Sequence, residues 1–217
     1  GDYQTLLADS GPRHQLGSGL SLGPTVDEEG DGQPNGTATG DGADEYGVVI
    51  PALSPGLAFN IQLNLNIPPS AGTTAVVDMF FDWNADGDFD DPSETPPPVV
   101  LPTGTQFVSM DVPIDAATGV DLGVRVRVSS TGTGSPIGTA LNGEVEDYLV
   151  QISPVFDFGD LPDTGPGTGV GNYQTLTNDG GPSHRLGSGL LLGAIVDDES
   201  DGPPTTNADG DDTTGAS

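Results

Sequence analysis

Alternation between apolar and polar residues is the clearest pattern along the chain. In LAFNIQLNLNI, 57–67, apolar residues hold every odd position and polar residues hold positions 60, 62, 64 and 66. A period of two residues is typical of a strand with one buried face. The segment 121–129 alternates in the same way, with apolar residues at 122, 124, 126 and 128. Similar patterns predict further strands at 47–52, 75–83, 98–101, 105–112 and 144–152.

The predicted strands favour an all-β fold. About seven short strands fall between residues 47 and 153, separated by turn-forming stretches such as PPSAGTT, DPSETPPP and TGTGSP. No segment shows a helical period. We therefore predict an antiparallel β-sandwich, Ig-like or jelly-roll-like, with long Gly/Asp-rich calcium-binding loops.

The two ends of the chain are copies of each other. Residues 1–47 and 171–217 align without a gap at an offset of 170, and 25 of the 47 aligned positions are identical. The predicted organisation has four parts: a first head, 1–46, that packs on the sandwich; a body, 47–153; a Pro/Gly linker, 154–170; and a second head, 171–217. We expect either a stretch of a longer tandem array or a subunit whose second head docks on the next copy.

The net charge of the chain limits the kinds of partner that it can bind. It has 33 acidic residues, four basic residues and a formal net charge of −29. This argues strongly against binding to nucleic acid, which needs a basic face, and equally against binding to anionic membrane surfaces. There is no cysteine and no apolar run of transmembrane length. We expect an extracellular or cell-surface protein in which calcium replaces disulfide bonds.

The segment DWNADGDFDD, 82–91, has the character of a calcium-binding loop. Oxygen-bearing side chains occupy alternate positions, and Gly87 holds the sixth place, where such a loop turns sharply. The twelfth place is Ser93 and not the usual glutamate, and Glu94 comes one place late. We expect a strand–loop–strand site that borrows its closing carboxylate, the alternative being a solvated acidic turn. The predicted ligands within the loop are Asp82, Asn84, Asp86, Asp88 and Asp90.

The expected source of that carboxylate is NGEVEDY, 142–148. In the predicted strand 144–152, Glu144 and Glu146 share a face with Tyr148, Val150 and Ile152. Burying two carboxylates without partners is costly, so we predict that a calcium ion binds Glu144 or Glu146. Two alternatives remain: pairing with the two arginines of 121–129, or a position beyond the sheet edge in water.

Each head carries an acidic cluster in a Gly-rich loop, and a solvated charged loop is the alternative to a second calcium site there. The predicted ligands are Asp27, Glu29, Asp31 and Asp41 in the first head, and Asp197, Glu199, Asp201 and Asp211 in the second. The linker sequence DFGDLPD adds Asp157, Asp160 and Asp163 just before the second head. We expect Asp157 and Asp160 to share calcium with that head and to stiffen the joint.

The residues with other reactive or ligand-binding side chains are expected to have structural roles. His14 and His184 recur in the motif GPxHxLGSGL, with no second His or Cys nearby, which indicates hydrogen-bonded structural residues. Trp83 is expected in the core or as a lid over the acidic loop. The sequence has no nucleophile elbow, phosphate-binding loop or dinucleotide fingerprint. We therefore expect no catalysis.

Several motifs resemble a known family. The string NGEVEDYLVQI, preceded by DWNADGDFDD and VRVRVSS, is similar to the GEVED domain of bacterial surface and secreted proteins. The block FDFGDLPD…YQTL…GPSHRLG…LGAIVDDESDG…GDD resembles the segment that leads into that domain. The resemblance implies a β-sandwich module, often repeated, without known catalysis. The chain departs from the family at ADEYGV, 43–48, where Tyr46 replaces an acid of runs such as DDEDGV, so no ligand role is carried over to Tyr46.

Three functions are compatible with these features. The favoured one is a calcium-stabilised structural repeat of an extracellular fibre, stalk or adhesin that assembles head-to-tail into a filament, with copies of itself and calcium ions as partners. The alternative is a calcium-dependent carbohydrate- or protein-binding module of a secreted multidomain protein, with glycans as partners. The third is a non-catalytic spacer attached to a secreted enzyme. Asn35 begins an N-glycosylation sequon.

Overall fold

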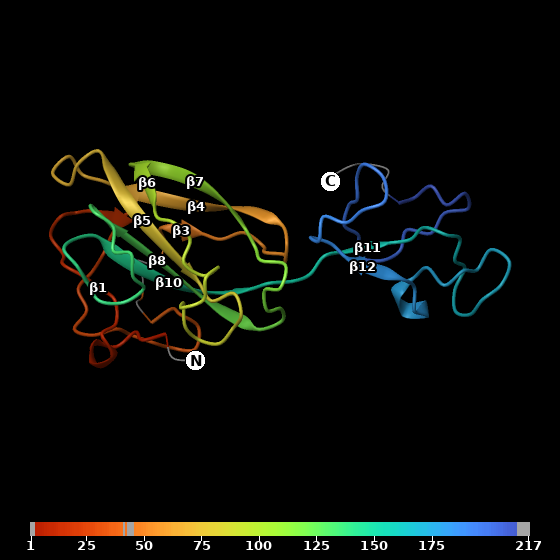
Figure 1. The fold of residues 1–217 in the computed structure, drawn as a ribbon, viewed down its shortest axis with the longest axis horizontal. Coiled ribbons are helices and arrows are strands. Elements are labelled where there is room, and N and C mark those ends of the chain that lie inside the picture. The colour runs from red at the N-terminus through yellow and green to blue at the C-terminus, as the bar shows by residue number, and fades with distance from the viewer. Residues whose placement is uncertain (1–2, 41, 43–45, 212–217) are drawn as a thin grey trace. The chain divides into compact units, whose positions relative to one another are not determined.

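The chain folds into two compact units, shown in Figure 1. The structure is a computed structural model that describes residues 3–40, 42 and 46–211. The first unit comprises Gly1–Leu53 and Ala58–Ile152, and the second comprises Ser54–Leu57 and Ser153–Ser217. The first head and the body therefore belong to one unit, and the second head folds with the residues just before it.

Two four-stranded antiparallel sheets form the centre of the first unit. In one sheet the strand order is β10-β8-β5-β6, with β5 at Thr74–Phe81, β6 at Val99–Pro102, β8 at Asp121–Ser129 and β10 at Glu144–Gln151. In the other, β4 at Ala58–Asn66 pairs with β7 at Gly104–Asp111 and with the short strands β2 at Ser21–Leu22 and β3 at Val48–Val49. All seven strands predicted in the body are present, β3 being shorter than expected.

One apolar core is shared by the two sheets. Alternate residues of β4 are buried, as the period of two predicted. In β5 the residues from 77 to 81 are all buried, and in β8 every residue after Asp121 is buried, so these two strands are covered on both faces. Leu22 of β2 and Val48 of β3 join the same cluster, and Trp83 stacks on Phe81 with a centroid distance of 4.6 Å. The mostly β, antiparallel class and the core position of Trp83 are confirmed, while the Ig-like or jelly-roll-like type stays a prediction.

The first head adds short elements to the body. The 3-10 helix η1 spans Leu7–Asp9, and β1 at Arg13–His14 pairs in parallel with β9 at Thr139–Ala140. This head therefore contributes β2 to one sheet and β1 to a separate two-stranded pair. Both head strands are only two residues long, as expected for a segment that is mostly loop.

The second unit repeats part of this pattern. Its 3-10 helix η2 spans Thr177–Asp179, and β12 at Ser183–Arg185 pairs antiparallel with β11 at Phe156–Phe158. The elements η2 and β12 lie 170 residues after η1 and β1. Strand β11 lies within the predicted linker, so this part of 154–170 is ordered by pairing with the second head.

Among the residues that the structure describes, no helix has the length and apolar character needed to cross a membrane.

Candidate functional site

Asp82 organises the acidic loop from the end of β5. Its side chain is buried, and Oδ1 accepts a hydrogen bond from the backbone N–H of Asp86 at 3.2 Å. Oδ2 accepts from the backbone N–H of Gly87 at 3.0 Å and from the Tyr3 hydroxyl at 2.7 Å. Gly87 has a φ of 92°, in the left-handed region that favours glycine. Asp82 therefore fixes the sharp turn and ties the first head to the loop.

The alternating spacing of the loop acids supports its backbone. The side-chain oxygens of Asn84, Asp86 and Asp88 each accept the N–H of the residue two places later, at 2.9, 3.3 and 2.9 Å respectively. Side chains of this kind commonly mimic a backbone turn. Together with Asp90, which donates the last of these N–H groups, the predicted ligands lie in one compact loop, and their metal-binding role stays a prediction.

Glu94 is the residue of this loop that the sequence pattern missed. Its side chain is fully buried, with 0% of its surface exposed. The pKa of its carboxyl group is raised to about 7, chiefly by burial and with smaller contributions from the nearby carboxylates of Asp82 and Asp91. The sequence signal was present, because Glu94 stands only one place after the twelfth position, but strict spacing excluded it.

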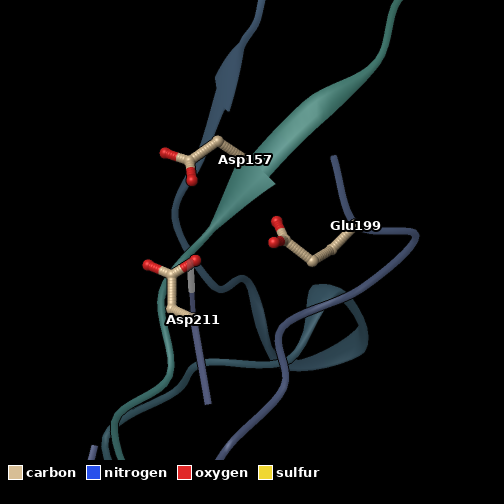
Figure 2. A group of neighbouring side chains, drawn as sticks. All are labelled: Asp157, Glu199 and Asp211. Carbon is tan, nitrogen blue, oxygen red and sulfur yellow. The ribbon is translucent and has the colours of Figure 1, made fainter. Parts of the chain in front are cut away.

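The clearest candidate metal centre lies in the second unit. Asp157, Glu199 and Asp211 each offer a carboxylate oxygen, and these three atoms all lie within 4.8 Å of one another. Figure 2 shows the three side chains pointing toward one another, with Asp157 on β11. No other group of three or more acidic, His or Cys residues comes as close within the described ranges. Carboxylate oxygens at this separation are suitable ligands for a hard divalent cation.

Local hydrogen bonds hold this triad. The Glu199 Oε2 atom accepts from the backbone N–H of Phe158 at 3.1 Å, and its own N–H donates to the carbonyl of Phe156. Asp160 accepts from the backbone N–H of Gly210 at 2.8 Å, next to Asp211. Burial raises the pKa of Glu199, and the charges of its acidic neighbours add to that effect. The predicted sharing of acids between the linker segment and the second head is therefore present as geometry.

Other predicted ligands serve as backbone acceptors in the heads. Asp201 Oδ1 accepts from the backbone N–H of Thr177 at 2.6 Å, and Asp31 Oδ1 accepts from that of Leu7 at 2.7 Å. The hydrogen bonds from Thr177 lower the pKa of Asp201. Asp163 accepts from the backbone N–H groups of 175 and 176, which lowers its pKa as well.

The remaining head acids are less tightly defined. Asp197 lies close enough to Glu199 to raise the pKa of that carboxyl group. Asp27 and Glu29 line a cavity of about 800 Å³ in the first unit, and Asp41 lies outside the described residues. In the first head, Glu29 corresponds to Glu199 and Asp41 corresponds to Asp211. The structure does not describe position 41.

Glu144 on β10 binds the backbone of the first head, and Glu146 binds the backbone at the start of the body. Glu144 Oε2 accepts from the N–H of Leu22 at 2.5 Å, and Glu146 Oε1 accepts from the N–H of Gly47 at 3.0 Å. Both side chains are buried, so the alternative that placed them in water beyond the sheet edge is wrong. Glu146 Oε2 also accepts from the Tyr148 hydroxyl at 2.5 Å. Their predicted role as calcium ligands stays untested.

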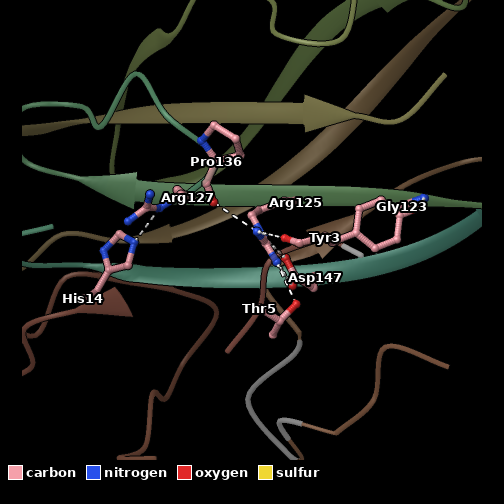
Figure 3. A network of polar contacts seen from close by, with 8 residues as sticks. All are labelled: Tyr3, Thr5, His14, Gly123, Arg125, Arg127, Pro136 and Asp147. Atoms are coloured by element: carbon pink, nitrogen blue, oxygen red, sulfur yellow. Dashed lines mark hydrogen bonds and ion pairs between the residues drawn. The ribbon is translucent and has the colours of Figure 1, made fainter. Parts of the chain in front are cut away.

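The two arginines of β8 lie on the opposite face of the sheet. Arg125 binds both carboxylate oxygens of Asp147 at 2.7 Å and donates to the Tyr3 carbonyl at 3.0 Å (Figure 3). Both arginines are buried. The alternative in which they pair with Glu144 and Glu146 is therefore wrong. Arg125 and Arg127 are held instead by the first head and by the loop that precedes β9.

His14 has the structural role that the sequence indicated. Its Nδ1 atom lies 2.8 Å from the Asn142 carbonyl, and its Nε2 atom accepts from Arg127 Nε at 3.1 Å (Figure 3). Burial lowers the pKa of His14 to about 4. Burial also lowers the pKa of Arg127 to about 10, and Arg125 adds to that effect. A neutral imidazole that accepts from a buried guanidinium fits this arrangement.

The string GEVED therefore has two faces with two tasks. Its two glutamates face the core and accept the backbone N–H groups of Leu22 and Gly47, and Asp147 faces the other way and holds Arg125. A scan against protein-family models matches the GEVED domain over residues 76–151, which contains this string and the acidic loop. No curated protein and no solved structure matches the chain. The matched stretch, residues 76–151, is therefore similar to a domain found in surface and extracellular proteins.

Proposed function

We propose that this chain is a calcium-stabilised structural repeat of an extracellular fibre, stalk or adhesin, and that its second head docks on a GEVED body. The role is mechanical and not catalytic. The proposed occupant of the docking surface is a body such as residues 47–152, and joining successive heads and bodies produces a filament.

One observation carries this proposal. In the first head Leu20 and Leu22 are 1% and 0% exposed, because they pack into the core of the body. The corresponding residues of the second head, Leu190 and Leu192, are 90% and 98% exposed. Removing apolar surface from water favours association by about 25 cal/mol per Å². The two leucine positions that belong to the core in the first head are therefore exposed to solvent in the second.

The body supplies matching features. The strand β4 pairs with β2 through Leu65 and Asn66, and Glu144 accepts the N–H of Leu22. A second head that docked in the same way would place Leu192 in the corresponding core and its N–H on the corresponding glutamate. The proposal therefore needs a body whose sheet edge at β4 is not already filled by its own head.

Calcium is the proposed source of stability in a chain with 33 acidic residues, four basic residues and no cysteine. The Asp157–Glu199–Asp211 triad supports a cation in the second unit. A cation there would link β11 to the second head and offset repulsion between the carboxylates.

The docking proposal can be tested by thiol labelling, because the chain has no natural cysteine. Leu192→Cys should react rapidly with a maleimide, and Leu22→Cys should react slowly and provide the buried reference. The chain is then extended after Ser217 by a copy of residues 48–152. We expect the labelling rate of Cys at position 192 to fall by about tenfold or more, toward that of the reference.

The labelling experiment also distinguishes docking on the body of a second copy from docking on a body of the same polypeptide. Protection that appears in the unextended chain as its concentration rises indicates docking on a second copy, and protection only in the extended chain indicates docking within one polypeptide. A cysteine at 192 that reacts equally fast in both chains at every concentration overturns the docking proposal.

The calcium proposal predicts a higher melting temperature in calcium than in chelator. Binding to the folded state alone adds about 2.7 kcal/mol when free calcium is 100 times the dissociation constant. Glu199→Gln should reduce calcium binding measured by calorimetry, whereas Asp198→Asn at the exposed neighbouring position is the matched control. Equal melting temperatures in calcium and in chelator would contradict the proposal.

A further inference from the structure

The acidic loop contains a buried carboxylate oxygen that lacks a hydrogen bond. Glu94 is 0% exposed, and its Oε1 atom has no hydrogen-bond partner among the residues that the structure describes. Buried polar atoms almost always have a partner, so an orphaned one calls for a ligand, an ion or a water. The position of Glu94 is fixed, because its N–H donates to the Asp91 carbonyl and its carbonyl accepts from Phe81 N–H, both at 3.0 Å.

Glu94 faces a small cavity lined by other oxygen-bearing side chains. The cavity has a volume of about 280 Å³, and Asn84, Asp91 and Asp115 lie on its wall with Trp83. A water molecule in the liquid occupies about 30 Å³, so the cavity has room for a cation that keeps part of its hydration. Its wall offers carboxylate and amide oxygens, which are the ligands of hard divalent cations.

The loop also draws two carboxylates to one point. The Asn84 side-chain nitrogen lies 2.9 Å from Asp86 Oδ2 and 2.5 Å from Asp91 Oδ2. A weak amide donor thus stands between two negative groups, where a full positive charge would be favoured more strongly. Rotation of the amide by half a turn would present the Asn84 oxygen in place of the nitrogen.

We propose that Glu94, with Asn84, Asp86 and Asp91, forms a calcium-type cation site within 82–94, and that Glu144 and Glu146 are not its ligands. The loop closes on its own glutamate, one place beyond the usual spacing. The two glutamates of β10 are engaged with the backbone N–H groups of Leu22 and Gly47. This inference rests on the proposed calcium dependence and names the ion site of the first unit.

Terbium luminescence tests this site in the full chain. Trp83, the single tryptophan, lies on the cavity wall, so bound Tb³⁺ should emit when tryptophan is excited, and calcium should compete with it. Glu94→Gln should weaken the apparent Tb³⁺ affinity by about tenfold or more, since it removes a charged ligand. Asp91→Asn lies at an exposed position and should weaken Tb³⁺ binding without a risk to folding.

Three further variants serve as controls. Glu199→Gln removes a triad acid of the second unit and should leave the tryptophan-sensitised emission unchanged. Glu144→Gln and Glu146→Gln should leave the Tb³⁺ affinity close to that of the natural chain. Loss of emission in either of the last two variants, together with full emission in Glu94→Gln and Asp91→Asn, overturns the inference.

The outcomes also separate this inference from the proposed function. Calcium that raises the melting temperature without any tryptophan-sensitised Tb³⁺ emission would overturn the Glu94 site alone. Calcium that changes neither the melting temperature nor the emission would overturn both.

Discussion

The two heads share a sequence pattern but not an environment. In the first head the leucines at 20 and 22 are part of a core, and in the second their equivalents at 190 and 192 lie in solvent. Even so, the same 3-10 turn forms in both, at Leu7–Asp9 and at Thr177–Asp179. The difference shows that local hydrogen bonds are enough to set the turn, whereas the apolar positions need a partner.

The repeated strand of the head makes the same point. Residues 13–14 pair in parallel with β9, and their equivalents in β12 pair antiparallel with β11. One segment thus accepts two kinds of neighbour, because a strand edge offers N–H and C=O groups that either direction can satisfy.

The largest expected difference between the heads concerns the leucines. Leu22→Ala should destabilise the first unit by about 2–5 kcal/mol, because it removes a fully buried side chain from the core. Leu192→Ala should change the stability of the chain by less than about 0.5 kcal/mol, as is usual at exposed positions. Denaturant unfolding of both variants measures this, with Trp83 fluorescence as the signal of the first unit. Equal losses would remove the contrast between the heads.

The histidines should sharpen the comparison through pH. Burial lowers the pKa of His14 to about 4, below the ordinary value of 6.5. Between these values the unfolded chain binds a proton that the folded chain does not, so the stability contributed by neutral His14 is present above pH 6.5. It is lost as the pH falls toward 4, by about 1 kcal/mol for each pH unit.

Two substitutions isolate this effect from the titration of the many carboxylates. Stability of the first unit is measured against pH in the natural chain, in His14→Gln and in the matched control His184→Gln, which alters an exposed residue. The excess fall in stability should vanish only in His14→Gln. The same fall in all three proteins would show that carboxylates alone are responsible.

The smallest expected effect concerns a hydrogen bond that both heads have, between an aspartate and the 3-10 turn. Asp31→Asn and Asp201→Asn each replace a carboxylate that accepts the first N–H of the 3-10 turn, and each should destabilise its own unit slightly and to a similar extent. Hydrogen exchange at Leu7 and Thr177 should rise to a similar extent. A large effect in one head only would mean that the turn depends on the body after all.

The strands could be predicted from the sequence because burial of one face imposes a visible period. The segment 121–129 matches β8 residue for residue, and 57–67 encloses β4. The burial of Arg125 and Arg127 could not be predicted from that period. The pattern marks their face as polar, but it carries no sign that the head and a loop cover it and satisfy both guanidinium groups.

The candidate sites were predicted in part for a similar reason. The order of the acidic residues along the chain suggested that Asp157 shares calcium with the second head, but it did not single out Glu199 and Asp211 as its neighbours, since nothing in the sequence shows how β11 pairs with β12. Glu94 was passed over because its contribution depends on the turn 91–94, which brings it back beside Asp91. Long-range pairing and turn geometry are the two kinds of information that spacing lacks.

The contacts of Glu144 and Glu146 have a consequence for how the proposed array could evolve. They hold main-chain N–H groups at Leu22 and Gly47, which every residue except proline can offer. Side-chain size is restricted at the core residues Leu20 and Leu22, and at Gly47, where an added Cβ would lie 2.3 Å from Leu22 Cβ. Under the proposed docking, a head that keeps its two core leucines can change at its exposed positions and still fit a body other than its own, so that duplicated modules stay compatible.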